Sequence, residues 1–337
     1  MFHHLRLTVF QAEYRTERAC QLPEYLGSTF RGVLGQELHA VSCVETASPC
    51  DLCRRPDRCA AGALFDSPLA GQTGLSATPT AEPAGAGGGF DQPRPYILVP
   101  PSRNRGTYAP GESIRLGLTL VGRSRAWYPW VVAAMAGIGR RGLGAERRNL
   151  SLARISSLGP LGAQTEIDTE TRGVTDHIPE LEGGQIVAEA PAPSSQAVVA
   201  FITPADLKRK GQRIDRLDGP TFFRRLIRRI GTLVESYCTI PPEAGPCDFH
   251  ALGALADQVT VKEQDVAMQT WERYSNRLEG KHPLSGLVGR ALLSDIPEPL
   301  WPYLILGQWV HVGKSASFGQ GRYMVLPQAE PARKETL

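Results

Sequence analysis

The sequence lacks long hydrophobic runs, a secretory leader and a strong net charge, and each absence excludes a class of protein. No apolar segment reaches the roughly 18–20 residues that a membrane span requires. The first residues, 1–6, contain no hydrophobic signal region, so a cytoplasmic protein without membrane contact is expected. The net charge of +3 argues against a chain that attracts nucleic acid over its whole surface, and 42% hydrophobic residues suffice for two modest cores.

Hydrophobic spacing predicts the same order of elements in both halves of the 337-residue chain. Each half has a strand, a helix, two strands, a second helix and a last strand, which is the βαββαβ pattern of ferredoxin-like (RRM-like) domains. We therefore expect an α+β fold with two tandem ferredoxin-like domains, residues 1–190 and 196–327, and a tail, 328–337. The aromatic strand motifs with which RNA-recognition modules stack bases are not evident, so binding across the sheet face is not expected. The predicted strands are 3–14, 96–100, 113–122, 149–158, 196–203, 258–275, 284–293 and 321–326, the predicted helices are 23–41, 127–139, 221–237 and 298–310, and further extended structure is expected over 165–187.

Two unusual segments interrupt the first domain. Residues 43–59 form a cysteine-rich insertion, and residues 67–93 form a Gly/Pro/Ala-rich loop that is predicted to be mobile. Four thiolates can hold a structural zinc tetrahedrally, and a cytosolic chain uses such spacing for metal more often than for disulfides. The spacing, C-x6-C-x2-C-x5-C, departs from paired C-x2-C knuckles, so reduced thiols or a redox role remain alternatives. The four candidate zinc ligands are Cys43, Cys50, Cys53 and Cys59.

A glycine-rich segment near the C-terminus, 313–321, follows an apolar run and carries cations. Glycine lets backbone N–H groups approach a ligand, and such groups beside cations form an anion site. The start of the segment is similar to the end of a nucleotide-binding P-loop, but Gln308 stands where that loop requires glycine. A glycine-rich turn without a ligand is the alternative. The residues expected to hold phosphate are Gly313, Lys314, Ser315, Gly319, Gly321 and Arg322.

Basic residues gather between positions 206 and 229, with a smaller cluster at Arg140, Arg141, Arg147 and Arg148. Such patches attract polyanions and make binding depend on salt. A solvated helix face explains many charge runs and remains the alternative. The residues expected to contact a polyanion are Lys208, Arg209, Lys210, Arg224, Arg225 and Arg228.

Two histidines stand out as candidates for proton transfer near neutral pH. His39 lies late in the first predicted helix, and its spacing from Ser28, Gly32 and Gly35 places all four on one face of small residues. This face could admit a nucleotide, or it could serve tight helix packing with a polar surface histidine. His311 directly precedes the glycine-rich segment, where it could position a phosphate or, as a cation, cap the end of the preceding helix.

These features together resemble the CRISPR-associated repeat-processing endoribonucleases of the repeat-associated mysterious protein (RAMP) superfamily. The resemblance is clearest over 196–327 and looser over 1–160. Besides the glycine-rich segment, it is carried by Phe30-Arg31-Gly32, Pro93-Arg94-Pro95-Tyr96, Phe201-Ile202-Thr203-Pro204, Trp271-Glu272-Arg273-Tyr274-Ser275 and the run 301–307.

The resemblance implies an enzyme that binds CRISPR repeat RNA and cuts the precursor into guide RNAs. Cleavage would be metal-independent and without a cofactor, because the RNA supplies its own 2′-OH as nucleophile. His39 matches the place of the family's catalytic histidine, with His311 and Lys314 as further catalytic candidates and Arg31 as a weaker RNA contact. Tyr25 is left out, because fourteen residues of straight helix separate it from His39 by about 21 Å. Alternatives are a non-catalytic RAMP subunit that holds guide RNA in an effector complex, and a zinc-stabilised adaptor that binds a protein partner.

Overall fold

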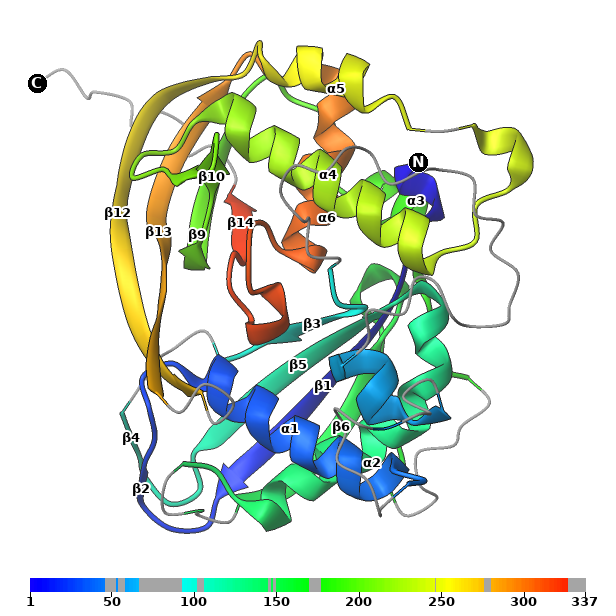
Figure 1. Cartoon of the computed structure of the whole chain (residues 1–337), viewed down its shortest axis with the longest axis vertical. Coiled ribbons are helices and arrows are strands. Elements are labelled where there is room, and N and C mark those ends of the chain that lie inside the picture. The colour runs from blue at the N-terminus through cyan, green and yellow to red at the C-terminus, as the bar shows by residue number, and fades with distance from the viewer. Residues whose placement is uncertain are drawn as a thin grey trace, which may run out of the picture.

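The chain folds into two halves, each with an antiparallel sheet and helices packed on it (Figure 1). The computed structural model describes residues 1–45, 53, 58–66, 93–101, 106–144, 147, 150–169, 177–245, 247–275 and 280–326. Cys50, Arg148, the tail 328–337 and nearly all of the loop 67–93 lie outside these residues. The fold class is α+β, as predicted.

The first half is built on a sheet with the order β3-β5-β1-β6-β7, in which β8 also pairs with β1. The alternation of β1 places Phe10, Ala12 and Tyr14 under two helices, α1 and α2. Its opposite face carries Glu13, which pairs with arginines on both neighbouring strands. The elements are β1 (Arg6–Thr16), β2 (Cys20–Gln21), α1 (Leu26–Ser42), β3 (Tyr96–Val99), β4 (Thr107–Tyr108), β5 (Ser113–Val121), α2 (Tyr128–Arg141), β6 (Leu150–Leu158), β7 (Gln164–Glu166), β8 (Leu181–Glu182) and α3 (Gly183–Ala188).

The second half has the sheet order β12-β13-β9-β14. In both halves the strands that follow the βαββαβ sequence are ordered second, third, first, fourth. The elements are β9 (Ala197–Ala205), β10 (Lys208–Arg209), β11 (Gln212–Arg213), α4 (Gly219–Tyr237), α5 (Phe249–Ala256), β12 (Thr260–Ser275), β13 (Gly280–Ser294), α6 (Trp301–Val310) and β14 (Tyr323–Leu326).

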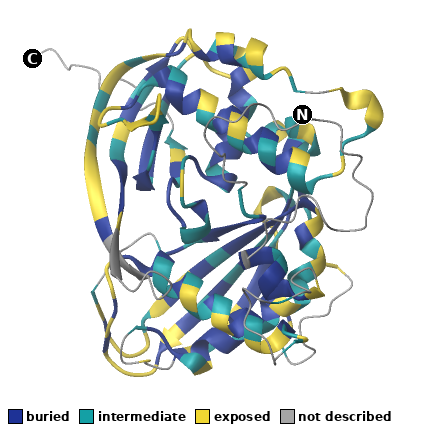
Figure 2. Ribbon diagram, in the orientation of Figure 1, coloured by how far each residue is buried: buried dark blue, intermediate teal, exposed yellow. Residues whose placement is uncertain are grey.

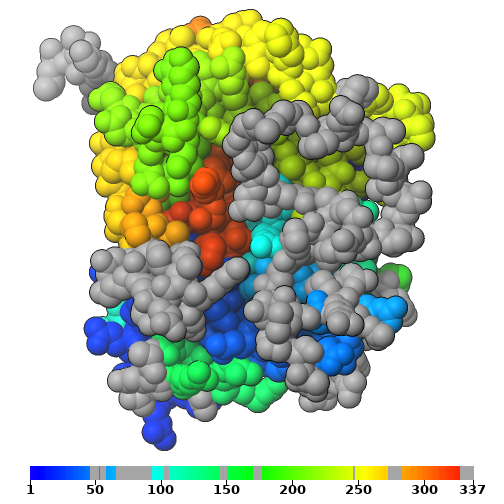
Figure 3. All heavy atoms as spheres, viewed as in Figure 1, coloured from blue at the N-terminus to red at the C-terminus, as the bar shows by residue number. Residues whose placement is uncertain are grey.

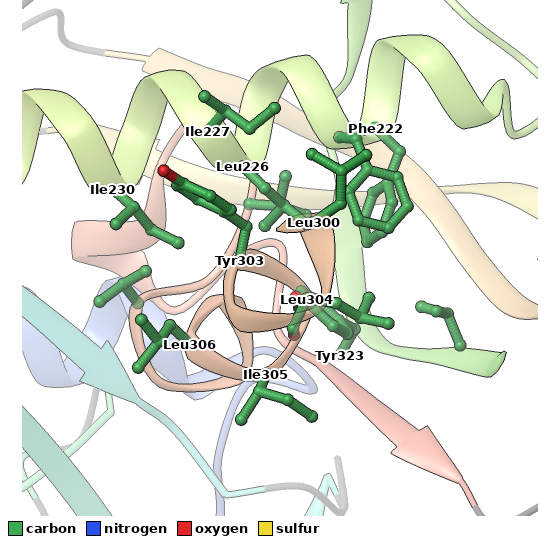
Figure 4. Close-up of a cluster of buried hydrophobic side chains, with 14 of the residues drawn as sticks. Phe222, Leu226, Ile227, Ile230, Leu300, Tyr303, Leu304, Ile305, Leu306 and Tyr323 are labelled. Atoms are coloured by element: carbon green, nitrogen blue, oxygen red, sulfur yellow. Dashed lines mark hydrogen bonds between the residues drawn. The ribbon is translucent and has the colours of Figure 1, made fainter. Parts of the chain in front are cut away.

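The core of the second half lies between α4, α6 and the sheet (Figure 4). Helix α4 begins where the Asp218 carboxylate accepts a hydrogen bond from the Thr221 N–H at 3.0 Å. Its apolar face, with Phe222, Leu226 and Ile230, points at α6. Tyr323 of β14 enters the same cluster and donates its hydroxyl to the Leu304 carbonyl at 2.6 Å, so its one polar group is satisfied within the core.

The two halves share core packing rather than meeting through a linker alone. Leu5, Leu7, Ile97 and Val121 of the first half belong to the core of the second. The long β12–β13 hairpin also runs along one side of the molecule to the start of α1 (Figure 1), where Trp271 stacks on Tyr25 with ring centroids 4.3 Å apart. Its outer strand β12 is largely exposed (Figure 2).

The predicted elements that carry the halves are present, with shifted ends. The prediction of extended structure over 165–187 is wrong for residues 183–187, which belong to α3. Helix α5 and the short β10–β11 hairpin were not predicted, because eight and two residues give too little periodicity to recognise. No helix among the described residues is long and apolar enough to cross a membrane.

Candidate functional site

The outer face of α1 forms one wall of a pocket of about 530 Å³. The small-residue face predicted from the sequence lines it, with Gly32, Gly35 and the partly exposed His39. The two glycines do different things. A Cβ at Gly35 would touch the Phe65 ring at 3.2 Å, so this glycine permits close packing, whereas a Cβ at Gly32 would meet no atom within 4 Å. The pocket therefore has open space beside Gly32, two turns before His39.

Arg31 lines the same pocket about two helical turns before His39. Its guanidinium lies between two rings, 5.1 Å from the centroid of Phe65 and 4.5 Å from that of Phe318. These stacks hold the guanidinium in place by cation–π attraction. Eight residues separate Arg31 from His39, or about 12 Å along a helix. Arg31 thus joins the pocket to the glycine-rich segment, to which Phe318 belongs.

A third cation reaches the pocket from α2. Arg141 is the last residue of that helix, and its Nε–H donates to the carboxylate of Glu37 on α1. Glu37 is buried, so the ion pair neutralises a carboxylate that would otherwise be costly to bury. The Arg141 side chain is still 30% exposed and lines the same pocket as His39.

The glycine-rich segment is packed inside the protein rather than opened toward a ligand. A Cβ at Gly321 would come within 1.7 Å of the Val312 carbonyl oxygen, and one at Gly319 within 2.2 Å of Pro100. Both residues have positive φ, +70° and +87°. Several backbone N–H groups of the segment donate hydrogen bonds to carbonyl groups of the protein. The donors are the N–H groups of Lys314, Phe318, Gly319, Gln320 and Gly321.

This geometry corrects the phosphate prediction for Gly319 and Gly321, because their backbones approach the protein itself. Gly313 likewise lies against the backbone of Asp206, where a Cβ would be 2.5 Å from the carbonyl oxygen. The segment contacts both halves of the protein. The Tyr25 hydroxyl of the first half donates to the Phe318 carbonyl, and the Thr203 hydroxyl of the second half donates to the Gly319 carbonyl at 2.8 Å. Lys314 of this segment is exposed. The red part of the chain, near the C-terminus, reaches the surface between the two halves in Figure 3.

His311 is the second correction. The ring is 1% exposed, and Nδ1 lies 3.1 Å from the Gln320 carbonyl, to which it donates. Burial, together with the charges of Arg229 and Arg322, lowers the pKa of His311 to about 3. His311 is therefore a neutral core residue, which is neither placed to touch a phosphate nor charged as a helix cap. Arg322 is half-buried, and burial lowers its pKa as well.

The basic stretch divides into anchors and surface groups. Arg225 donates to the Lys208 carbonyl, with Nη2 at 2.5 Å, and the Nε–H of Arg229 donates to the Val310 carbonyl at 2.6 Å. Arg224 is exposed but paired with Asp257 at 2.6 Å. The anchoring role corrects the prediction of Arg225 as chiefly an RNA contact.

The β10–β11 hairpin lies next to the glycine-rich segment, because the Lys314 N–H donates to the Asp206 carbonyl at 3.4 Å. Arg209 and Lys210 are exposed on this hairpin, while Arg213 is paired with Asp206. The structure thus brings Lys314 next to Asp206, the ion-pair partner of Arg213 on the hairpin, about a hundred residues away in sequence. Among the described residues no contact joins Lys314 or His311 to the His39 pocket, so the three predicted catalytic residues do not form one cluster.

Three of the four predicted zinc ligands are described, and none of the three forms a disulfide bond. Cys43 and Cys53 lie close enough to Cys59 to raise the pKa of its thiol, although burial is the main cause. Within the described part of the chain, no group of three or more His, Cys, Asp or Glu side chains is arranged to hold a metal. Cys50 lies outside that part, and the structural zinc stays a prediction.

Two family models and one curated protein match the sequence of this chain. A family model described as an N-terminal domain matches residues 5–179, and the model of the CRISPR-associated endoribonuclease Cas6 matches residues 199–323. An uncharacterized protein of Archaeoglobus fulgidus is 22% identical over 311 residues, which cover 90% of this chain and 92% of that protein.

Solved structures share the fold along nearly the whole chain. Thermus thermophilus Cas6 (TTHB231) has a TM-score of 0.53 at 16% identity, with 96% of this chain and 99% of that chain covered. A product complex of Cas6 (TTHA0078) has a TM-score of 0.52 at 15% identity, with 96% and 100% covered. A partial Cas6-RT-Cas1–Cas2 complex has a TM-score of 0.53 at 12% identity and covers 96% of this chain and 46% of that one.

The fold and these matches define a protein of the RAMP type, the class that handles repeat RNA in CRISPR systems. Within that class, residues 199–323 match the Cas6 family of CRISPR-associated endoribonucleases, in agreement with the resemblance that the sequence motifs indicated.

Proposed function

We propose that the protein cuts CRISPR precursor RNA within each repeat by metal-independent transesterification. The 2′-OH attacks the adjacent phosphate, which leaves a 2′,3′-cyclic phosphate on one product and a 5′-OH on the other. One observation carries the proposal: a partly exposed histidine shares an open pocket on α1 with two arginines, Arg31 and Arg141. Such a pocket supplies a proton-transfer group and cations for the phosphate charge. The Cas6 match over residues 199–323 supports the RNA-cleaving class, and the mechanism is our inference from the pocket.

His39 acts as the general base or acid in this proposal. Gly32 leaves room beside it for the RNA backbone, because nothing lies within 4 Å of the position a Cβ would take. Lys314 and the exposed cations of the β10–β11 hairpin hold RNA phosphates away from the cut. A role for Lys314 in RNA binding, rather than in the chemical step, fits its position beside that hairpin.

We also propose that both halves are ferredoxin-like domains, with a boundary between about residues 190 and 196. The equal strand order in the two sheets supports this assignment. The partner is the repeat RNA and then its guide RNA product, in keeping with the product complex of Cas6 (TTHA0078). The protein also associates with further CRISPR subunits in this proposal, because one structure of similar fold is part of a Cas6-RT-Cas1–Cas2 complex.

The test is cleavage of a repeat RNA from the same genome, in EDTA, with the product ends mapped. Wild-type protein should make one cut per repeat and leave a cyclic phosphate. The His39→Ala variant should cut about 10²–10⁴-fold more slowly, the usual contribution of a general acid or base. His250→Ala is the matched control, because His250 is exposed on α5 and far along the chain from the pocket.

Each other outcome has a definite meaning. RNA binding without cutting by any of the proteins would favour the guide-holding subunit. Equal cutting by wild type and His39→Ala would keep the nuclease and remove His39 from its mechanism. Cutting that EDTA abolishes would contradict the metal-independent mechanism.

The predicted structural zinc needs a separate measurement. Zinc content per purified chain, with and without Cys59→Ser, would settle whether the cysteine insertion holds metal. One zinc per wild-type chain, lost in the variant while RNA cleavage persists, would establish a structural site.

A further inference from the structure

We infer that Arg141 is a second catalytic residue of the α1 pocket, which binds the scissile phosphate, and that Glu37 is its positioning residue. The inference rests on the proposed cleavage of RNA at His39 and deepens it. It assigns a role to a side chain that the sequence showed merely as part of a surface arginine cluster.

The first argument is placement. Arg141 comes from α2, whereas the other polar lining residues, Arg31, Gln36 and His39, come from α1. Arg141 therefore adds a cation from a second helix to a pocket whose other cations come from α1. The Arg141 side chain is 30% exposed, so it is mostly shielded from solvent but can still be reached by a ligand in the pocket. A cation in such a place attracts a phosphate more strongly than one on the open surface.

The second argument is fixation. The Glu37 side chain is 11% exposed and accepts the Nε–H of Arg141. A Cβ at Gly137 would lie 1.8 Å from the Glu37 Oε2 atom, so glycine on α2 makes space for this carboxylate. The ion pair uses one of the five N–H donors of the guanidinium. No partner for the four donors on the terminal nitrogens is found among the described residues.

These observations match what the reaction needs. As the 2′-oxygen bonds to phosphorus, its proton passes to the base, and negative charge gathers on the two non-bridging oxygens. The bond from phosphorus to the 5′-oxygen then breaks, and that oxygen takes up a proton. The planar fork of an arginine can donate to two phosphate oxygens at once. A guanidinium held by Glu37 stabilises this charge without having to be reoriented during the reaction.

The competing explanation is that the Arg141–Glu37 ion pair only holds α1 and α2 together. Two measurements distinguish this structural role from phosphate binding. A structural role would change thermal stability and leave the chemical step alone. A phosphate-binding role would change the single-turnover rate constant, with little change in affinity for an RNA whose 2′-OH is replaced by hydrogen at the cut. Arg141→Gln is the primary variant, because glutamine can still donate a hydrogen bond to Glu37 and so avoids a buried, unpartnered carboxylate.

The experiment compares wild type, Arg141→Gln, Glu37→Gln, the double variant and Arg115→Gln. Arg115 is the matched control, since it also pairs with a glutamate, Glu13, but on the sheet face away from the helices. Arg141→Gln should lower the cleavage rate constant by about 10²–10³-fold, as loss of one charge-stabilising donor does in other enzymes. Glu37→Gln should slow cleavage less, and should add nothing in the Arg141→Gln background. Arg141→Ala is added for a rescue test, in which free guanidinium ion should restore part of the cleavage rate.

The inference is overturned if Arg141→Gln cuts at the wild-type rate, or if it loses binding and cutting in equal measure. It is equally overturned if the rate falls only in step with thermal stability and guanidinium does not restore it. Failure of the wild type itself to cut repeat RNA would instead refute the proposed function, and with it this role for Arg141.

Discussion

At the scale of single residues, burial decides which of the predicted groups can act. His39 and His311 look alike in the sequence as histidines near glycines, yet one lines a pocket and the other is 1% exposed in a core. The difference arises because His311 directly follows α6, whose last turn is enclosed by the second half. No pattern in the local sequence distinguishes these two environments.

The buried His311 predicts a pH dependence of stability. Its pKa is about 3 in the folded protein and near the ordinary 6.5 when unfolded, so the unfolded chain binds the proton more readily. The contribution of neutral His311 is complete above pH 6.5 and is lost as the pH falls toward 3, by about 1.4 kcal/mol per pH unit. Denaturant unfolding at pH 7, 6, 5 and 4 should show this slope in wild type and a reduced slope in His311→Gln. Equal slopes in both proteins would contradict the prediction.

Gly32 allows stability and function to be separated at one position. Because a Cβ there meets nothing within 4 Å, Gly32→Ala should stabilise the helix by up to about 1 kcal/mol. The added methyl group would also narrow the open part of the pocket, so RNA cleavage should slow while the melting temperature rises. A rise in melting temperature with unchanged cleavage would show that RNA does not enter beside Gly32.

At the scale of elements, the glycines of the segment 313–321 allow close packing against the protein itself rather than against a ligand. Gly321 has φ +70° and lies against the Val312 carbonyl, so Gly321→Ala should cost more than the roughly 1–2 kcal/mol of the left-handed conformation alone. Gly111→Ala is the matched control, since Gly111 has φ +83° but open space around it. Equal losses in unfolding free energy for both variants would show that the close approach at Gly321 is relieved at no cost.

The β10–β11 hairpin carries a prediction of its own about affinity. Replacing Lys208, Arg209 and Lys210 with alanine should weaken RNA binding similarly for all sequences, because phosphate contacts carry no base information. The slope of log Kd against log salt should also fall, by about 0.7–0.9 for each phosphate contact removed. Arg115→Ala on the first sheet is the control. An unchanged slope would mean that the hairpin does not touch RNA.

At the scale of the whole molecule, the two halves act as one unit because they share a core and an aromatic clasp. Trp271, near the end of the β12–β13 hairpin, stacks on Tyr25 at the start of α1. The Tyr25 hydroxyl also donates a hydrogen bond to the Phe318 carbonyl. Trp271→Ala should lower the unfolding free energy by about 3–5 kcal/mol, and should increase amide exchange in the hairpin and at the start of α1 while the centre of α4 stays protected. Exchange that rises equally throughout the protein would show that the clasp does not act locally.

The sequence alone determined the order of the main helices and strands, the predicted face of small residues on α1 and the resemblance to CRISPR-associated endoribonucleases. These follow from properties of neighbouring residues: the period of the apolar positions, the spacing of glycines on a helix, and motifs in a fixed order. The tertiary structure decided what those residues face. It buried His311, turned the glycines of 313–321 toward protein carbonyls, and brought Arg141 from α2 to the His39 pocket. Burial and the meeting of distant side chains depend on how the sheets and helices pack, and packing is a property of the whole chain rather than of any one segment.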